Sequence, residues 1–263
     1  MTASAPTPLT LRTEGAVAVV EIDNPPANAL DWALYGALED LLPRLAADDR
    51  VRAVVFTGAN PKIFVAGADL KQLGADALTP VNVETRIVRA QRVFAALEAL
   101  PKPTVAAIGG HAMGGGCELA LALDFRVMER GRARIGLPEA ALGLMPSAGG
   151  TQRLPRLVGR DRAARMMMLA ERLDADEAER IGLVSRAVEA PVGEQALALA
   201  RDLSEMPASS LRGIKSALAA AGDLDPGLAA ERAAAELVFA HPDAAEGVAA
   251  FLEKRPGRFH HDH

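Results

Sequence analysis

The sequence reads Gly114-Gly115-Gly116-Cys117-Glu118 and then continues with the apolar residues 119–123. Three successive glycines are unfavourable inside a helix, because each loses backbone entropy and packs no side chain. The run after Glu118 has no polar face, which is typical of a short, fully buried helix. A glycine-rich turn that opens such a helix directs free N–H groups and the positive end of the helix dipole at whatever lies in front of it. This stretch is therefore predicted to form half of an active site.

The composition favours one large domain, or one domain with an appendage. The chain has 263 residues, of which 50% are apolar, and this is enough to bury a sizeable core. The formal net charge is −5. That balance argues against a nucleic-acid partner, because general nucleic-acid binders usually carry a basic patch.

The cellular compartment is indicated by three features of the sequence. The single cysteine, Cys117, excludes an intramolecular disulfide framework and suits a reducing cytosol. The apolar runs fall short of the roughly 18 residues that a membrane-spanning helix needs. Residues 1–8 lack the basic and apolar regions of a signal peptide. We therefore expect a cytoplasmic protein with no membrane partner.

The hydrophobic pattern predicts strands in the first three quarters of the chain and helices in the last. Strands are expected at residues 9–12, 16–22, 51–57, 104–108, 125–128, 134–136 and 184–188. Besides the buried helix after Glu118, helices are expected at residues 31–47, 82–100, 138–141, 151–157, 159–169, 175–181, 193–205, 207–221, 226–240 and 243–254. This order predicts an α/β core over residues 1–192 and a helical C-terminal region over residues 193–263.

Two loops place small residues where backbone amides can be exposed. One is Ala66-Gly67-Ala68, and the other is the glycine stretch that opens the buried helix. A pair of N–H donors from two loops forms an oxyanion hole, which stabilises negative charge on a carbonyl oxygen. Two carboxylates, Glu118 and Glu139, belong to separate elements nearby. Paired carboxylates beside a polarised carbonyl suit acid–base chemistry at the neighbouring carbons.

Simpler interpretations remain open for these residues. The glycines could form a tight turn, and Glu118 alone would more often be a charge at a helix start. A dinucleotide site is disfavoured, because the spacing is not Gly-x-Gly-x-x-Gly at the start of a long βαβ unit. A metal site at His111, Cys117 and Glu118 lacks zinc-ligand spacing. A triad of Ser147, His111 and Asp124 lacks a nucleophile elbow.

Taken together, the motifs resemble the enoyl-CoA hydratase/isomerase (crotonase) superfamily. They lie at residues 64–71, 114–120, 137–143, 146 and 149–154, with further matches at 24–30, 182–184 and 246–255. Any one motif would be a weak signal, but their order and spacing cover almost the whole chain. The resemblance implies an α/β, crotonase-like (ClpP/crotonase) spiral of ββα units with a helical C-terminal trimerisation region.

The same resemblance implies the substrate and the partners. The substrate is expected to be an acyl-CoA thioester of fatty acid metabolism, such as an intermediate of beta-oxidation. No metal or other cofactor is expected, because coenzyme A is part of the substrate. Homotrimers, commonly stacked as homohexamers (dimers of trimers), are the expected assembly.

Matched residue by residue, the resemblance also implies roles. The oxyanion donors are the backbone amides of Ala68 and Gly115, and the catalytic residues are Glu118 and Glu139. The backbone around Ala66 matches the segment that holds the CoA adenine. The CoA- and substrate-binding residues are Ala66, Gly67, Asp69, Leu70, Lys71 and Gly114. The stretch from Leu73 to Val83 is distinctive and should shape the acyl pocket.

The presence of two glutamates favours one reaction. With the thioester carbonyl polarised, Glu118 would activate a water for attack on C3 and Glu139 would protonate C2, so an enoyl-CoA becomes a 3-hydroxyacyl-CoA. Isomerases of the superfamily generally use one carboxylate, at the position of Glu139, so the pair favours a hydratase. An isomerase, another acyl-CoA thioester reaction, or a non-catalytic (for example RNA-binding) scaffold member remain as alternatives.

Overall fold

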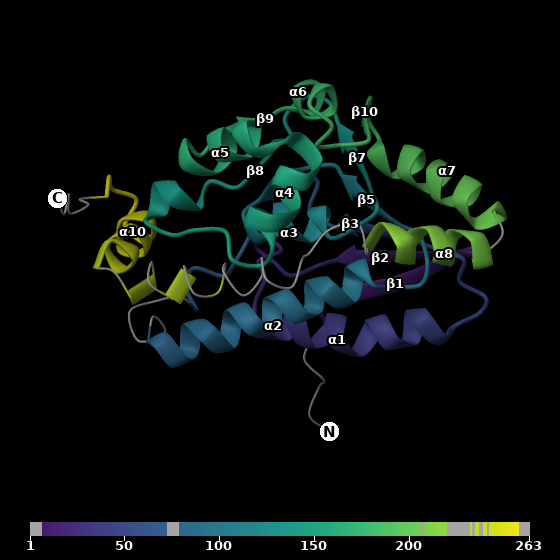
Figure 1. Cartoon of the computed structure of the whole chain (residues 1–263), viewed down its shortest axis with the longest axis horizontal. Coiled ribbons are helices and arrows are strands. Elements are labelled where there is room, and N and C mark those ends of the chain that lie inside the picture. The colour runs from purple at the N-terminus through teal and green to yellow at the C-terminus, as the bar shows by residue number, and fades with distance from the viewer. Residues whose placement is uncertain are drawn as a thin grey trace.

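Two β-sheets organise the computed structural model, which describes residues 7–72, 79–206, 208–219, 232, 235–236, 239–240 and 242–257. Within these ranges the larger sheet has six strands in the order β1-β2-β3-β5-β7-β10, and the smaller has four in the order β4-β6-β8-β9 (Figure 1). The strands span Leu9–Glu14 (β1), Val17–Ile22 (β2), Ala53–Gly58 (β3), Ile63–Val65 (β4), Thr104–Ile108 (β5), His111–Met113 (β6), Phe125–Glu129 (β7), Ile135–Gly136 (β8), Arg172–Leu173 (β9) and Arg186–Val188 (β10).

Helices surround these sheets. They span Trp32–Ala47 (α1), Pro80–Glu98 (α2), Gly115–Leu121 (α3), Gly150–Val158 (α4), Arg160–Met168 (α5), Ala175–Arg180 (α6), Val192–Glu205 (α7), Ala208–Ala219 (α8) and Pro242–Leu252 (α10), with a 3-10 helix, η2, at Glu139–Leu142. The first helix begins where the sequence predicts, because the carboxylate of Asp31 accepts a hydrogen bond from the N–H of Leu34 at 2.8 Å. None of the described helices is long and apolar enough to cross a lipid bilayer.

From β3 to β8, successive strands alternate between the two sheets. Strand β3 belongs to the larger sheet and β4 to the smaller, and the pairs β5–β6 and β7–β8 repeat this division. Helix α2 follows the first pair and α3 follows the second. The chain therefore advances as ββα units, which confirms the spiral expected from the sequence.

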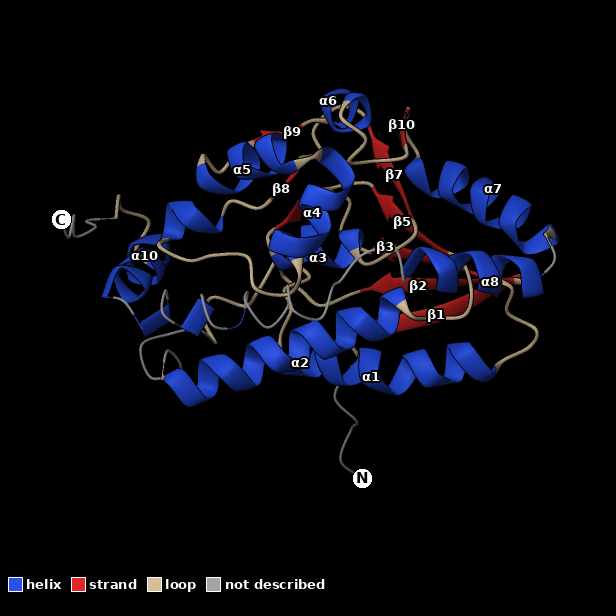
Figure 2. Cartoon of the chain, in the orientation of Figure 1, coloured by secondary structure: helices blue, strands red, loops and turns tan. Residues whose placement is uncertain are grey.

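The inner strands β2, β3 and β5 of the larger sheet are buried on both faces, which explains their continuous apolar sequences. In β3, Val54 and Phe56 pack into the core on the side of α1 and α2. The alternate residues Ala53 and Val55 pack into a second cluster with α7. Figure 2 shows α1 and α2 side by side along one side of the molecule and α7 on another. Among the described strands of this sheet, β1 alone departs from the parallel arrangement, and it pairs antiparallel with β2 across a turn that contains Gly15.

Three short strands are not expected from the sequence. Strands β4, β6 and β9 are three, three and two residues long, and such segments cannot show a two-residue alternation. Several predicted boundaries were wrong by two residues: β1 ends at Glu14, β3 starts at Ala53, α2 spans Pro80–Glu98, β10 starts at Arg186 and α10 ends at Leu252. Residues 73–78 and most of the helix expected at 226–240 lie outside the described residues.

The C-terminal helices pack onto the core in two places. Helix α7 lies directly on the larger sheet, and α10 contacts η2. Phe239 and Val248 join Val83 and Ile87 of α2 in a third apolar cluster. The C-terminal region therefore closes one side of the space in front of η2. The division of the chain at residues 192/193 stays a prediction.

Candidate active site

The smaller sheet brings the two predicted loops together. Strands β4, β6 and β8 are parallel neighbours, so their carboxyl ends meet at one edge of the sheet. Residues 66–68 follow β4, Gly114 and Gly115 follow β6, and Glu139 lies three residues after β8. The short strands that the sequence does not reveal are therefore what place these groups side by side.

The backbone N–H groups of Ala68 and Gly115 are both available at this edge. Leu30 bridges to Ala68, with the N–H of Leu30 bonded to the carbonyl of Gly67 and the N–H of Asp69 bonded to the carbonyl of Leu30. Because successive residues of an extended chain point their N–H groups to opposite sides, the N–H of Ala68 points away from Leu30. In the described part of the chain, neither Ala68 nor Gly115 donates this group to another residue.

Close backbone contact explains why glycine begins the buried helix. A Cβ on Gly116 would lie 2.1 Å from the carbonyl oxygen of Val65 at the end of β4. A Cβ on Gly115 would lie 2.5 Å from Cδ1 of Leu30 and 3.7 Å from the amide nitrogen of Ala68. The absence of side chains lets α3 sit directly against the first loop, which keeps the two amides close together.

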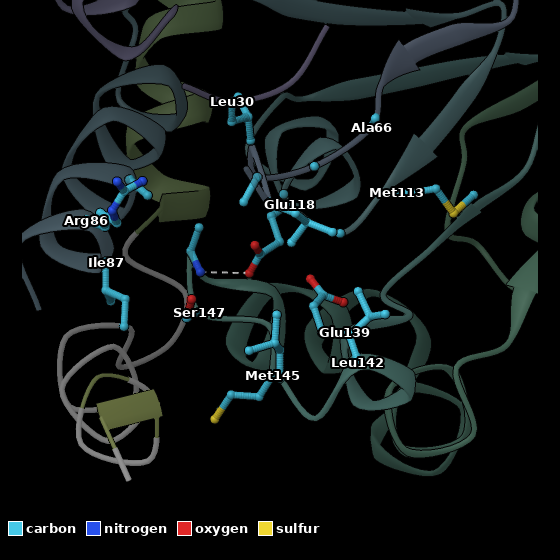
Figure 3. A pocket seen from close by; sticks show the side chains of 18 of the residues that line it. Leu30, Ala66, Arg86, Ile87, Met113, Glu118, Glu139, Leu142, Met145 and Ser147 are labelled. Carbon is cyan, nitrogen blue, oxygen red and sulfur yellow. Dashed lines mark hydrogen bonds between the residues drawn. The ribbon is translucent and has the colours of Figure 1, made fainter. Parts of the chain in front are cut away.

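A cavity opens in front of these amides (Figure 3). The space that the centre of a water molecule can occupy there is about 160 Å³, against the roughly 10–15 Å³ that one water needs. Its lining is mainly apolar, with side chains from α1, α2, η2 and the segment after η2. Glu118 and Glu139 both line it, and Figure 3 shows their carboxylates directed into the same space.

Glu118 is held by the segment that leads into α4. It lies on α3 and is only 3% exposed. Its Oε1 accepts hydrogen bonds from the backbone N–H groups of Ala148 and Gly150, both at 2.8 Å. These two donors orient the carboxylate and offset part of the cost of burying its charge.

Glu139 reaches the cavity from the other side. It is half-buried at the start of η2, and a Cβ placed on Gly114 would lie 3.0 Å from its Oε1. The N–H of Gly114 is bonded to the carbonyl of Gly136 at 3.0 Å, so β6 and β8 fix the distance between the glycine turn and this carboxylate. The two glutamates thus approach one space from separate elements.

Burial and the negative charge of these carboxylates raise the pKa of two neighbouring groups. The pKa of the Cys117 thiol is raised by burial, and then by the charges of Glu139 and Glu118. The pKa of the Tyr35 hydroxyl is raised by burial and by the charge of Glu118. Both groups therefore stay protonated at neutral pH. Cys117 is a free, buried thiol.

Most of the predicted site residues line the cavity. They are Ala66, Gly67, Ala68, Leu70, Gly114, Gly115, Glu118 and Glu139. Asp69 and Lys71 are not part of the lining, and the carboxylate of Asp69 instead accepts a hydrogen bond from the N–H of Lys71 at 2.9 Å. A role for these two residues in CoA binding stays a prediction.

The cavity also has lining residues that the sequence analysis did not identify. They include Trp32 and Tyr35, which are the chain's one tryptophan and one tyrosine. Helix α2 contributes a stripe, Val83, Arg86, Ile87 and Ala90. Residues at positions i, i+3, i+4 and i+7 lie on one face of a helix, so this spacing in the sequence could have identified the stripe. Val83 was predicted to shape the pocket as the end of the stretch from Leu73.

The alternative sites find no support among the described residues. No group of three or more histidine, cysteine and acidic side chains lies there in positions that could hold a metal ion. Asp124 does not serve a triad, because its carboxylate binds the side chains of Thr104 at 2.9 Å and Lys215 at 2.6 Å.

Comparisons with known proteins show what the chain as a whole resembles. A profile described as enoyl-CoA hydratase/isomerase matches residues 12–262. The chain is 38% identical to crotonyl-CoA hydratase of Syntrophomonas wolfei, over 95% of this chain and 96% of that protein. It is also 38% identical to the short-chain-enoyl-CoA hydratase of Clostridium acetobutylicum, over 93% and 94%. The crystal structure of an enoyl-CoA hydratase from Mycobacterium avium subsp. paratuberculosis superposes with a TM-score of 0.85 at 30% identity, over 97% and 99% of the two chains.

Proposed function

The chain belongs to the enoyl-CoA hydratase/isomerase family, and we propose that it adds water across the C2=C3 double bond of a 2-enoyl-CoA to give a 3-hydroxyacyl-CoA. One observation carries this proposal: two carboxylates, Glu118 and Glu139, share a cavity with two unengaged backbone N–H groups. A proton shift within the acyl chain needs one group that moves a proton. Addition of water needs one group to activate the water and another to deliver a proton to carbon.

The amides of Ala68 and Gly115 bind the thioester oxygen. They withdraw electron density from the conjugated system, so C3 becomes electrophilic and negative charge develops on the oxygen. Amides fixed by a β-bridge and by the start of a helix need little reorganisation at that moment. Removal of one such donor costs about 3–4 kcal/mol of barrier where this has been measured.

The two glutamates then complete the addition. Glu118 accepts a proton from the water as the water's oxygen forms a bond to C3. Glu139 donates a proton to C2 as the enolate collapses to the thioester. The overall change adds one hydrogen to C2 and one hydroxyl group to C3, and the roles reverse in dehydration. The chain's residues perform these steps with no cofactor beyond the coenzyme A of the substrate.

The remaining predicted residues suit the CoA part of the substrate. Ala66, Gly67 and Leu70 line the cavity next to the amide of Ala68. Asp69 and Lys71 flank Leu70 outside the cavity, and Lys71 is exposed. A thioester held at the amides would extend its CoA portion past this segment, where an exposed cation can meet a phosphate.

We propose that the chain assembles as a homotrimer or a homohexamer. Large apolar side chains are exposed on helices at the surface of the single chain, including Met168 on α5 and Ile214 and Leu218 on α8. Such residues suit burial against another copy. Light scattering after size exclusion should give three or six times the subunit mass. A cytoplasmic location is proposed as well, and cell fractionation tests it.

Absorbance of the conjugated enoyl thioester tests the reaction. Hydration of crotonyl-CoA removes the conjugation, so the wild-type protein should bleach this absorbance at a rate proportional to its concentration. A product identified by chromatography as 3-hydroxybutyryl-CoA would support the hydratase. Formation of 3-butenoyl-CoA, or no change with any short or medium 2-enoyl-CoA, would overturn the proposal.

A further inference from the structure

One cation lies in the lining of the acyl pocket. Val83, Arg86, Ile87 and Ala90 form the face of α2 that borders the cavity. Next to them lie apolar residues of the third cluster, such as Leu144 and Phe239, which also line the cavity. Among the described lining residues, Arg86 is the one with a basic side chain. Figure 3 shows Arg86 and Ile87 on the opposite side of the cavity from Glu139.

The guanidinium of Arg86 is held in position but is incompletely bonded. It lies over the ring of Trp32, 4.9 Å from the ring centre, and its Nη2 donates to the carbonyl of Gln72 at 2.8 Å. Its Nε is buried and donates to no described residue. A buried N–H without an acceptor costs free energy, so the described residues leave part of the hydrogen-bonding capacity of this guanidinium unused.

The charge of Arg86 is also left without a close counter-ion in the described part of the chain. Asp69 and Tyr35 are the groups whose fields act on it, and neither forms an ion pair with it. Tyr35 stays neutral, because burial and the charge of Glu118 raise the pKa of its hydroxyl. Burial lowers the pKa of Arg86, although an arginine remains charged at neutral pH.

A second arginine on the same helix, Arg89, has a structural role and serves as a comparison. Arg89 lies over the same Trp32 ring at 5.1 Å. Its guanidinium is paired through two hydrogen bonds with Glu39, at 2.6 and 3.2 Å, and it does not line the cavity. Arg86 has the same aromatic support, but it lines the cavity and forms no ion pair with a described residue.

We propose that Arg86 determines specificity by binding a carboxylate at the far end of the acyl chain, so that the preferred substrates are 2-enoyl-CoA thioesters with an acidic terminus. A carboxylate accepts two N–H groups of a guanidinium at once and supplies the missing charge. A methyl-ended chain would leave a half-buried cation against hydrocarbon, which is unfavourable. This inference rests on the proposed function, because it assigns the substrate of the same site.

The test compares thioesters of equal length that end in a carboxylate or in a methyl group. With the wild-type protein, kcat/KM should be higher for the carboxylate-ended member at the length that reaches Arg86. Arg86→Met should lower the ratio of the two kcat/KM values by about 10- to 100-fold, the loss expected for hydrogen bonds to a charged group. Arg86→Lys, which keeps the charge and loses the planar fork, should give an intermediate ratio.

Arg89→Met is the matched control, because it removes the other arginine that stacks on Trp32 and should leave the ratio unchanged. If Arg86→Met lowers kcat/KM equally for both substrates, the arginine serves the CoA portion or the glutamates and the inference is overturned. The same follows if the wild-type protein shows no preference for an acidic terminus at any length. In either case hydration of crotonyl-CoA still stands as evidence for the proposed function.

Binding of saturated acyl-CoA thioesters provides a second readout that does not need turnover. Their dissociation constants can be measured by calorimetry for the wild-type protein, for Arg86→Met and for Arg89→Met. A tighter complex with the carboxylate-ended thioester, weakened by Arg86→Met and kept by Arg89→Met, supports the inference even if the catalysed reaction is not hydration. Equal affinities for the two chain ends would overturn it.

Discussion

Oε1 of Glu118 accepts a hydrogen bond of 2.8 Å from the backbone N–H of Gly150, the first residue of α4. A second bond of equal length comes from Ala148. The position of the carboxylate therefore depends on a segment about thirty residues away along the chain. Both donors are backbone groups, so the contact depends on the path of the chain around Gly149. This arrangement fixes the position of one carboxylate oxygen of Glu118 at the edge of the cavity.

Glu118→Gln and Glu139→Gln should each lower kcat by about 100- to 10,000-fold, the usual contribution of a general acid or base. A glutamine at position 118 can still accept the N–H groups of Ala148 and Gly150 through its carbonyl oxygen, so the shape of the site should be retained. Rates with crotonyl-CoA, together with binding of a saturated thioester, separate chemistry from affinity.

Stability and binding measurements on the same two variants control for effects on folding and affinity. Because each variant keeps the size of the side chain, the free energy of unfolding should stay near the wild-type value. A variant that binds the saturated thioester normally and retains nearly full kcat would remove that glutamate from the mechanism. Retention of activity by Glu118→Gln alone would leave Glu139 as the one carboxylate that the reaction needs.

Gly116→Ala should separate the backbone amides of Ala68 and Gly115, which we propose bind the thioester oxygen. The new Cβ would lie 2.1 Å from the carbonyl oxygen of Val65, so α3 must move away from the end of β4. We expect a loss of about 1–3 kcal/mol in the free energy of unfolding, as for overpacked sites. A shift of about 1 Å in the amides can cost about 100-fold in kcat/KM. Urea denaturation and the crotonyl-CoA assay measure the two effects.

Gly193→Ala is the control for that experiment. Gly193 lies in α7, and a Cβ there would meet nothing within 4 Å. Alanine should stabilise the helix by up to about 1 kcal/mol and leave activity unchanged. Wild-type activity in Gly116→Ala would show that the close contact between α3 and β4 is not needed to hold the amides together.

The chemistry of the site could be predicted from the sequence more readily than its construction. The glycine stretch, Glu118 and Glu139 carry signals in residue type and spacing, and the structure brings them to one cavity. Strands β4 and β6 place them there, yet segments of three residues have no readable periodicity. The orientation of Arg86 could not be predicted either, because a charge on an amphipathic helix is normally assigned to solvent.

Arg126→Met should destabilise the protein strongly. Arg126 is buried at the start of β7, and its guanidinium donates to the carbonyls of Leu183 at 2.8 Å and of Leu123 at 2.6 Å. It also donates to the carbonyl of Ala120 at the end of α3. Removal of these donors leaves buried carbonyls unpaired, so we expect a loss of about 3 kcal/mol or more.

Urea denaturation of the free protein measures this loss. The exposed Arg132, changed to methionine in the same way, should alter stability by less than about 0.5 kcal/mol. Because Arg126 holds the end of the helix that carries Glu118, the midpoint for loss of activity should fall with the midpoint for unfolding. Equal stability of the two variants would refute a role for Arg126 in anchoring α3.

Glu39→Gln should reveal a contribution to stability that depends on pH. Hydrogen bonds from Arg89, and then from Arg92, lower the pKa of Glu39 from its ordinary 4.5 to about 2. A lowered pKa stabilises the folded protein above pH 4.5, and this contribution is lost as the pH falls from about 4.5 to about 2. The side chain is 29% exposed, so solvent screening reduces the effect to about 1 kcal/mol.

The free energies of unfolding of wild type and Glu39→Gln should therefore differ at about pH 7 and converge toward about pH 3. As a control at an exposed neighbouring carboxylate, Asp40→Asn should change the free energy of unfolding at about pH 7 by less than about 0.5 kcal/mol. A wild-type-to-Glu39→Gln difference that stayed constant between about pH 7 and about pH 3 would refute the pairing of Glu39 with the two arginines.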